Sequence, residues 1–134
     1  MTDLKLMELA VEARKNSYAP YSDFHVGAVL LGKSGRVYTG CNVENAGYTP
    51  TNCAERTALF KAVSEGEREF TAIAVVGGKG AELAAFCAPC GVCRQVLAEF
   101  CDGDFRILLG TPEKYSAHTL SELLPYSFGK ADLK

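Results

Sequence analysis

The stretch "FTAIAVVG", residues 70–77, is an almost unbroken run of apolar residues near the middle of the chain. A half-buried strand alternates apolar and polar residues, whereas a strand in a sheet covered on both faces is apolar throughout. The run therefore predicts a central strand with helices packed on both sides of its sheet. Earlier in the chain, the β-rich segments "HVGAVLL" (25–31) and "RVYTGCN" (36–42) flank the turn sequence "GKSG" (32–35) and predict a hairpin.

Segments with helical patterns alternate with these strands. "DLKLMELAVEARK" (3–15) has the one-sided apolar spacing of a surface helix, and "CAERTALFKAVSEG" (53–66) is a helix that ends at a glycine. The remaining expected elements are a helix at 91–100, a strand at 105–110 and a short helix at 119–125. Because strands and helices alternate, we expect an α/β domain in which a mixed sheet lies between layers of helices.

Length and composition are typical of one soluble globular domain, so we expect residues 1–134 to form it. The net charge of −2 comes from 14 basic and 16 acidic residues that are scattered along the chain, which disfavours a nucleic-acid partner. No run approaches the ~20 apolar residues of a membrane span, and the N-terminal stretch lacks signal-peptide character. We therefore expect a cytoplasmic protein without a membrane partner, in which the six cysteines are kept reduced.

Cysteines are gathered at two predicted helix starts. Cys53 opens one helix, and Cys90 and Cys93 open another. The unpaired N–H groups and partial positive charge of a helix N-terminus favour thiolates. If the two ends converge, they bring three thiolates to one cation, which is the ligand number of a catalytic zinc site with one position open for water. Glu55 would then be placed to move protons beside that water.

Other interpretations of these cysteines remain open. Cys87, Cys90 and Cys93 match the start of a bacterial ferredoxin run, although Leu97 stands where the next cysteine is expected. A purely structural zinc module with four cysteines is another alternative. The segment "GAVLLGKS" (27–34) also satisfies the phosphate-loop pattern, but its middle is typical of a strand and a second strand follows, so we expect a hairpin there.

Five motifs together resemble the small zinc-dependent cytidine deaminases of homotetrameric type: "YSDFHVGA", "TGCNVENAGY", "CAER", "PCGVCRQ" and "LLPYSFG". They span Tyr21 to Gly129. Deaminases of this class carry an H-x-E…P-C-x-x-C signature, and cysteine replaces the histidine here. The resemblance implies a three-layer α/β/α sandwich with a mixed, roughly five-stranded sheet.

The resemblance also implies the chemistry. Cys53, Cys90 and Cys93 would bind one Zn²⁺ per chain, and Glu55 would be the catalytic proton carrier. Water activated by the metal would attack C4 of cytosine, while Glu55 protonates the ring nitrogen and then the departing ammonia. Cytidine and deoxycytidine would become uridine and deoxyuridine, in pyrimidine salvage.

The substrate contacts implied by the resemblance are Phe24, Asn42, Glu44, Tyr48, Ala54 and Phe128. Asn42 and Glu44 would contact ribose hydroxyls, and Phe24 would line the base pocket. Phe128 would close over the base in a neighbouring subunit's site, which implies a homotetramer with shared active sites. A deaminase of another cytosine compound, such as a nucleoside antibiotic, is disfavoured because the "NVEN" segment is typical of ribose binding.

Three thiolates leave a zinc site with a net negative charge, so we expect a positive charge nearby. Arg56 is the candidate to donate hydrogen bonds to the ligand sulfurs, with Arg94 as a weaker candidate. The other residues that could bind metal are expected to take no part, namely Cys41, Cys87, Cys101, His25 and His118.

Overall fold

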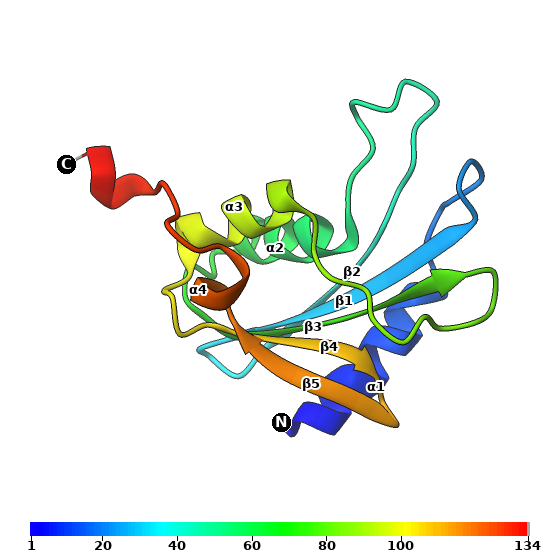
Figure 1. Cartoon of the computed structure of the whole chain (residues 1–134), viewed down its shortest axis with the longest axis horizontal. Helices are drawn as coiled ribbons and strands as arrows, with labels where there is room; N and C mark the ends of the chain where they lie inside the picture. Colours follow the sequence, from blue (N-terminus) through cyan, green and yellow to red (C-terminus); the bar gives the residue numbers. More distant parts are fainter. Residues whose placement is uncertain (134) are drawn as a thin grey trace.

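The computed structural model describes residues 1–133 of the chain. A five-stranded sheet in the order β2-β1-β3-β4-β5 runs through the middle of the described chain (Figure 1). The β3–β4 pair is parallel and the other pairs are antiparallel, so the sheet is mixed as expected. The strands are β1 (Phe24–Gly32), β2 (Val37–Cys41), β3 (Phe70–Lys79), β4 (Arg106–Thr111) and β5 (Lys114–Thr119).

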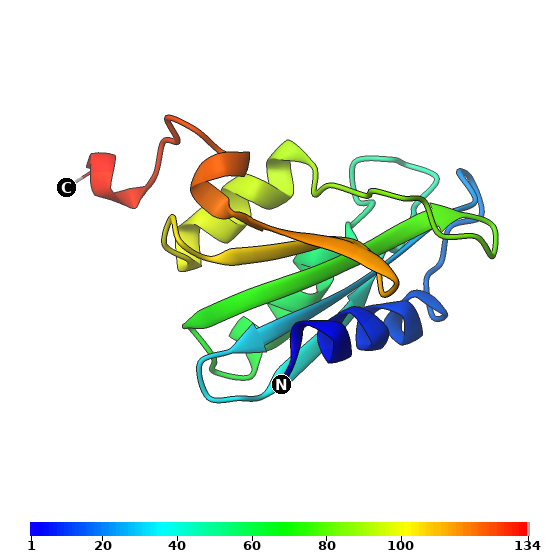
Figure 2. The ribbon, with the colours of Figure 1, turned by 60° about the horizontal axis from the view of Figure 1, so that its bottom comes forward.

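Helices cover both faces of this sheet. Helix α1 (Asp3–Arg14) packs on one face, and α2 (Ala54–Ser64) and α3 (Gly91–Phe100) lie on the other (Figures 1 and 2). The short helices α4 (Leu120–Leu123) and η1 (Lys130–Leu133) follow β5. The predicted three-layer α/β/α sandwich is confirmed. Within residues 1–133, no helix combines the length and the apolarity that crossing a membrane requires.

The apolar run at 70–77 forms the centre of the sheet, as predicted, because β3 pairs with β1 on one side and β4 on the other. Its side chains alternate between two cores. Ile73 and Val75 pack in the core beneath α2 and α3, whereas Ala74 and Val76 pack in the core against α1. Because helices cover both faces of the sheet, the residues that point to one face are apolar and so are those that point to the other.

No sequence pattern predicts β5, although the resemblance implies its existence. Most side chains of "KYSAHT" are exposed, because the strand lies at the edge of the sheet and pairs only with β4. An exposed edge strand leaves little apolar alternation in the sequence. The helix after it begins where predicted, since Thr119 and Glu122 form a capping box around the first turn of α4.

Candidate metal and nucleoside site

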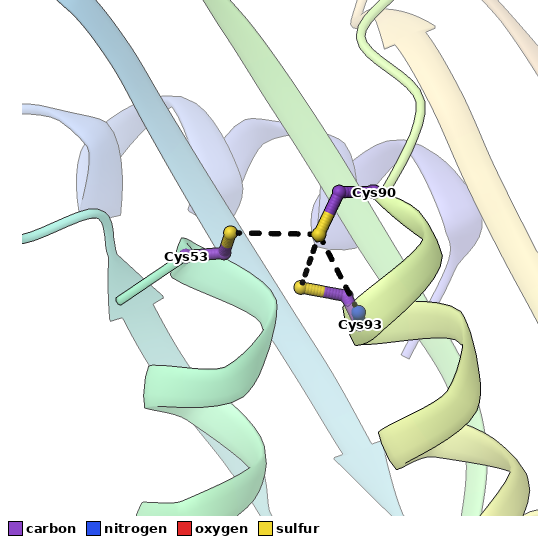
Figure 3. A group of neighbouring side chains, drawn as sticks. All are labelled: Cys53, Cys90 and Cys93. Atoms are coloured by element: carbon purple, nitrogen blue, oxygen red, sulfur yellow. Dashed lines mark hydrogen bonds between the residues drawn. The ribbon is translucent and has the colours of Figure 1, made fainter. Parts of the chain in front are cut away.

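Three thiols face one another where α2 and α3 begin (Figure 3). Cys53 is the N-cap residue of α2, Cys90 is the N-cap residue of α3, and Cys93 lies in the first turn of α3. The Cys90 Sγ lies 3.8 Å from the Cys53 Sγ and 3.5 Å from the Cys93 Sγ. The two helix N-termini therefore converge as the sequence predicts.

The spacing of these sulfurs fits a zinc ion. Tetrahedral zinc holds sulfur at about 2.3 Å, so two sulfur ligands of one ion lie roughly 3.8 Å apart. The three Sγ atoms here lie within 4.8 Å of one another, and the two short separations are close to that value. Thiolates are also the soft donors that zinc accepts. Three protein ligands leave a tetrahedral ion one open position, as in catalytic sites.

A close contact between α2 and β2 holds Cys53 in place. Gly40 of β2 lies directly beneath the start of α2, where an added Cβ would come 2.4 Å from the Ala54 carbonyl oxygen and 2.5 Å from the Ala58 nitrogen. Only glycine permits this approach. The side chains of Ala54 and Ala58 are fully buried at this contact. The small residues therefore seat the N-terminus of α2 against the sheet and fix the direction in which Cys53 points.

Arg56 brings positive charge to the three thiols. Its Nη2 donates to the Cys53 Sγ over 3.3 Å. Hydrogen bonds from the Cys93 thiol and from Arg56 lower the pKa of Cys53 to about 5, against the opposing effect of burial. The pKa of Cys93 is raised in turn, because its thiol donates to the Cys53 sulfur. Arg94 instead donates to backbone carbonyls, so the charge beside the sulfurs comes from Arg56.

Glu55 is buried beside the thiols. The residue is only 4% exposed, and this burial raises the pKa of its carboxyl group to about 7. The negative charge of Cys53 raises this pKa further, while Arg56 opposes the rise. A carboxyl group with a pKa near neutrality is suited to both accepting and returning a proton.

Two adjoining pockets connect the thiols with the predicted nucleoside contacts. The pocket at the thiols has a volume of about 200 Å³, and its lining includes Phe24, Asn42, Cys53, Ala54, Glu55 and Cys90. The second pocket has a volume of about 400 Å³, and its lining includes Tyr21, Ser22, Glu44 and Tyr48. Thr51 lines both pockets. The fold thus brings five of the six predicted substrate contacts around this pair of pockets.

Asn42 and Glu44 are held by hydrogen bonds within the chain. The Asn42 Oδ1 accepts from the Val26 N–H over 2.9 Å, and its Nδ2 donates to the Phe24 carbonyl over 2.8 Å. The Glu44 carboxylate accepts from both the hydroxyl and the backbone N–H of Ser22, and these bonds hold the pKa of Glu44 below its usual value. Both side chains are therefore oriented by the protein itself.

Phe128 lies outside both pockets of its own chain. The residue is 60% exposed, and its backbone carbonyl accepts a hydrogen bond from the Gln95 side chain over 2.8 Å. In both views the segment after α4 projects away from the loop at 42–53 (Figures 1 and 2). Phe128 is therefore the one predicted substrate contact that the fold brings to neither pocket of its own chain.

Cys87 lines the pocket without joining the sulfur cluster. The group of residues in 1–133 that could hold a metal consists of Cys53, Cys90 and Cys93 and does not include Cys87, which argues against both four-cysteine alternatives. Burial raises the pKa of the Cys87 thiol to about 11. Cys87 thus lies outside the sulfur cluster but forms part of the pocket wall.

Sequence reasoning missed the remaining walls of the pocket, which are Val26, Thr51, Asn52 and Ala88. Val26 lies in β1, and the other three lie in irregular segments, so no periodic pattern marks them. Neither histidine belongs to the cluster of possible metal ligands. His25 bonds to Ser17 and Asp23, and the ring of His118 packs edge-on against Phe86.

Known proteins are similar in sequence to this chain over nearly its full length. Residues 1–109 match the family model of the cytidine and deoxycytidylate deaminase zinc-binding region. A cytidine deaminase of Sporosarcina psychrophila is 49% identical over 130 residues, which cover 96% of this chain and 93% of that protein. A cytidine deaminase of Halalkalibacterium halodurans is 51% identical over 129 residues, which cover 96% of this chain and 95% of that protein.

Solved structures share the fold as well. The cytidine deaminase of Burkholderia pseudomallei superposes with a TM-score of 0.87 at 46% identity, covering 96% of this chain and all of that chain. The cytidine deaminase of Mycobacterium tuberculosis gives a TM-score of 0.80 at 39% identity, covering 96% and 99%. The similarity therefore extends well beyond the cysteine motifs to the whole α/β/α sandwich.

Proposed function

Because this chain belongs to the cytidine and deoxycytidylate deaminase family and is an enzyme of the cytidine deaminase type, we propose that it hydrolyses both cytidine and deoxycytidine to uridine and deoxyuridine. The observation that carries the proposal is a cluster of three thiols, two of which line one pocket together with the buried carboxyl group of Glu55. We assign the activity to a single domain of residues 1–134 and its role to pyrimidine salvage.

One zinc ion per chain, held by Cys53, Cys90 and Cys93, is the proposed cofactor. When bound, zinc supplies a Lewis acid that lowers the pKa of water. Arg56 and the two helix N-termini offset the negative charge of the three thiolates, because each places positive charge next to the sulfurs. The proposal thus gives Arg56 a role in holding the metal rather than in touching the nucleoside.

Glu55 is the proposed proton carrier of the reaction. Its carboxylate accepts a proton from the attacking water and passes it to the ring nitrogen next to C4 of cytosine. A second proton, also from the water, goes to the amino group, so the C4–N bond breaks and ammonia leaves. The reaction consumes one water per ammonia released, and the carboxyl group ends as it began. Its pKa of about 7 suits this exchange.

Five of the proposed substrate contacts line the two pockets. Phe24 and Ala54 lie in the pocket of the thiols and would contact the base there. Asn42, Glu44 and Tyr48 surround the junction and the second pocket, where the sugar would lie. Because the hydrogen bonds of Asn42 and Glu44 already fix their side chains, little conformational freedom is lost on binding.

The substrate is a nucleoside rather than a nucleotide in this proposal. Among the described residues that line the two pockets, none is lysine or arginine. Phosphate groups are usually held by such cations or by helix N-termini. The N-termini of α2 and α3 point at the sulfurs instead.

We also propose a cytoplasmic homotetramer with shared active sites. Support comes from Phe128, which is exposed and outside the pockets of its own chain, and from the exposed apolar residues Phe60, Val92 and Tyr126. Exposed apolar side chains that lie together in one patch mark surfaces that contact other proteins. The reducing cytoplasm would keep the three ligand thiols free for metal.

The test is an ammonia-release assay on the purified zinc-loaded protein with cytidine, deoxycytidine and cytidine monophosphate as separate substrates. We expect turnover of both nucleosides and little turnover of the monophosphate. Preference for the monophosphate would contradict the assignment of the substrate, and absence of turnover with all three would contradict the proposed reaction.

A further inference from the structure

Arg14, the last residue of α1, is a buried cation without an acidic partner. The residue is 9% exposed, and none of the ion pairs found within residues 1–133 includes it. Its guanidinium group donates to backbone carbonyls instead. Nε donates to His25 over 2.7 Å, Nη1 donates to Ala81 over 3.4 Å, and Nη2 donates to Gly78 over 2.7 Å and to Gly80 and Glu82 over 2.8 Å each. These carbonyl dipoles offset the cost of burying the charge.

The five carbonyls belong to three separate segments. His25 lies in β1, Gly78 lies in β3, and residues 80–82 open the irregular segment that leads from β3 to α3 (Figure 1). Further along, this segment carries Cys87 and Ala88, which line the pocket, and it ends at Cys90. We name residues 80–89 the crossover loop. One guanidinium group therefore joins the start of the crossover loop to two strands of the sheet.

The crossover loop passes from one face of the sheet to the other. Leu83 packs against the core on the α1 side, whereas Cys87 packs against the core beneath α2 and α3. Backbone hydrogen bonds tie the loop to its surroundings at Gly80, whose N–H donates to Asp23, and at Ala84, whose N–H donates to Gly77. The carbonyls of Gly80 and Glu82 rely on Arg14.

Helix α1 is itself set firmly against the sheet, so the position of Arg14 is well defined. An added Cβ at Gly27 of β1 would lie 2.1 Å from the Ala10 carbonyl oxygen and 2.5 Å from the Arg14 nitrogen. Only glycine permits α1 to lie this close to β1. The end of the helix is therefore held at the depth from which the Arg14 side chain reaches the five carbonyls.

We propose that Arg14 is a positioning residue for the deaminase site, which sets the path of the crossover loop and so the positions of Cys87, Ala88 and Cys90. Arg14 lines neither pocket, so it acts through the loop and not on the substrate. Lysine cannot replace it, because one ammonium nitrogen cannot reach all of the carbonyls that the guanidinium group bonds from its three separate nitrogens. The role of Arg14 in catalysis rests on the proposed function, whereas its effect on the crossover loop does not.

The test compares Arg14→Ala and Arg14→Lys with Arg106→Ala as the control. Arg106 also fastens α1 to the sheet, through a two-bond ion pair with Asp3, but it touches no segment of the site. Hydrogen exchange of every peptide and kcat/KM for cytidine are measured on the full zinc-loaded chain. We expect faster exchange confined to the crossover loop and a fall in kcat/KM of roughly 10- to 100-fold for Arg14→Ala.

Two further results support the proposal. Guanidinium ion at non-denaturing concentration restores part of the kcat/KM of Arg14→Ala, and Arg106→Ala keeps its kcat/KM within about twofold of the original chain, since an exposed ion pair contributes little. If Arg14→Ala does not fold, Arg14→Lys decides by the same loop-specific exchange and loss of kcat/KM.

Three results overturn the proposal. They are unchanged exchange and kinetics in the folded variant, faster exchange spread evenly over the sheet, or failure of both Arg14 variants to fold, because the last two make Arg14 a general stabilising residue. If the original chain does not turn over cytidine, the proposed function fails by itself. The exchange measurement still tests Arg14 in that case.

Discussion

The Nη2 atom of Arg56 lies 3.3 Å from the Sγ atom of Cys53, three residues earlier in the chain. Cys53 is the N-cap residue of α2 and Arg56 is the third residue of the helix, so the first turn brings the two side chains together. Glu55, between them in sequence, is buried in the pocket. The four residues "CAER" thus supply a thiol, a carboxyl group and a compensating charge from one helical turn.

Arg56→Gln is expected to weaken zinc retention while leaving the fold intact. Glutamine is shorter than arginine and carries no charge, so both the hydrogen bond to Cys53 and the positive charge that offsets the thiolates from this side are lost. Zinc content is measured after dialysis against increasing chelator concentrations, with circular dichroism as a check of folding. Arg36→Gln is the matched control, because Arg36 pairs with Glu65 on the surface, away from the thiols. Equal zinc retention in the two variants would show that the helix N-termini suffice.

Substitution of a cluster cysteine by alanine is expected to abolish zinc binding, whichever of Cys53, Cys90 and Cys93 is changed. Two thiolates bind zinc far more weakly than three, and the open position would no longer be defined. Cys87→Ala is the control in the same pocket and should keep one zinc per chain. Elemental analysis of the four purified variants gives the metal content. An empty site in Cys87→Ala would mean that the ligand set includes a fourth cysteine.

Phe128→Ala is expected to raise the KM for cytidine without loss of zinc. The side chain is exposed in its own chain, and we propose that it closes over the base in a neighbouring subunit. Sizing of the original chain by light scattering should give about four copies, as the family resemblance implies. Leu133→Ala, which removes another exposed apolar side chain near the C-terminus, is the control. A fully active monomer would contradict the shared site but not the zinc chemistry.

The ion pair between Asp3 and Arg106 is expected to make stability depend on pH. Hydrogen bonds from Arg106 lower the pKa of Asp3 below its ordinary value of 3.8, so the pair stabilises the fold above that pH and is lost as the pH falls through the lowered pKa. Asp3→Asn should therefore lower the free energy of unfolding at pH 7 by about 0.2–1 kcal/mol. Urea titrations at pH 7 and at strongly acid pH should show this difference shrinking in acid. An equal difference at both pH values would assign the effect to something other than the pair.

The sequence predicts the central sheet and the helices well because burial leaves a periodic or continuous apolar pattern. β3 is an almost unbroken apolar run since both of its faces are covered, and α1 has apolar residues on the side that meets the sheet. β5 leaves no such pattern because most of its side chains are exposed. Its place at the edge follows from pairing with β4, which is a tertiary contact.

The candidate site also contains residues that the sequence predicts and residues that it does not. Cys53, Glu55, Cys90 and Cys93 can be predicted because each lies at a fixed offset from a helix start. Thr51 and Ala88 cannot, because they line the pocket only once irregular segments have folded around it. The carbonyl contacts of Arg14 are also hidden in the sequence, since an arginine at the end of a helix is ordinarily a solvent-exposed last-turn cation.

The most direct test of the proposed chemistry is to measure zinc content and cytidine turnover on the same sample of Glu55→Gln. Glutamine is nearly isosteric with glutamate but cannot carry protons at neutral pH. We predict that the variant keeps zinc at the level of the original chain while kcat falls by at least ~10²–10⁴, the contribution of a general acid–base group. A zinc-loaded variant that releases ammonia from cytidine at nearly the original rate would contradict the assignment of Glu55 as the proton carrier.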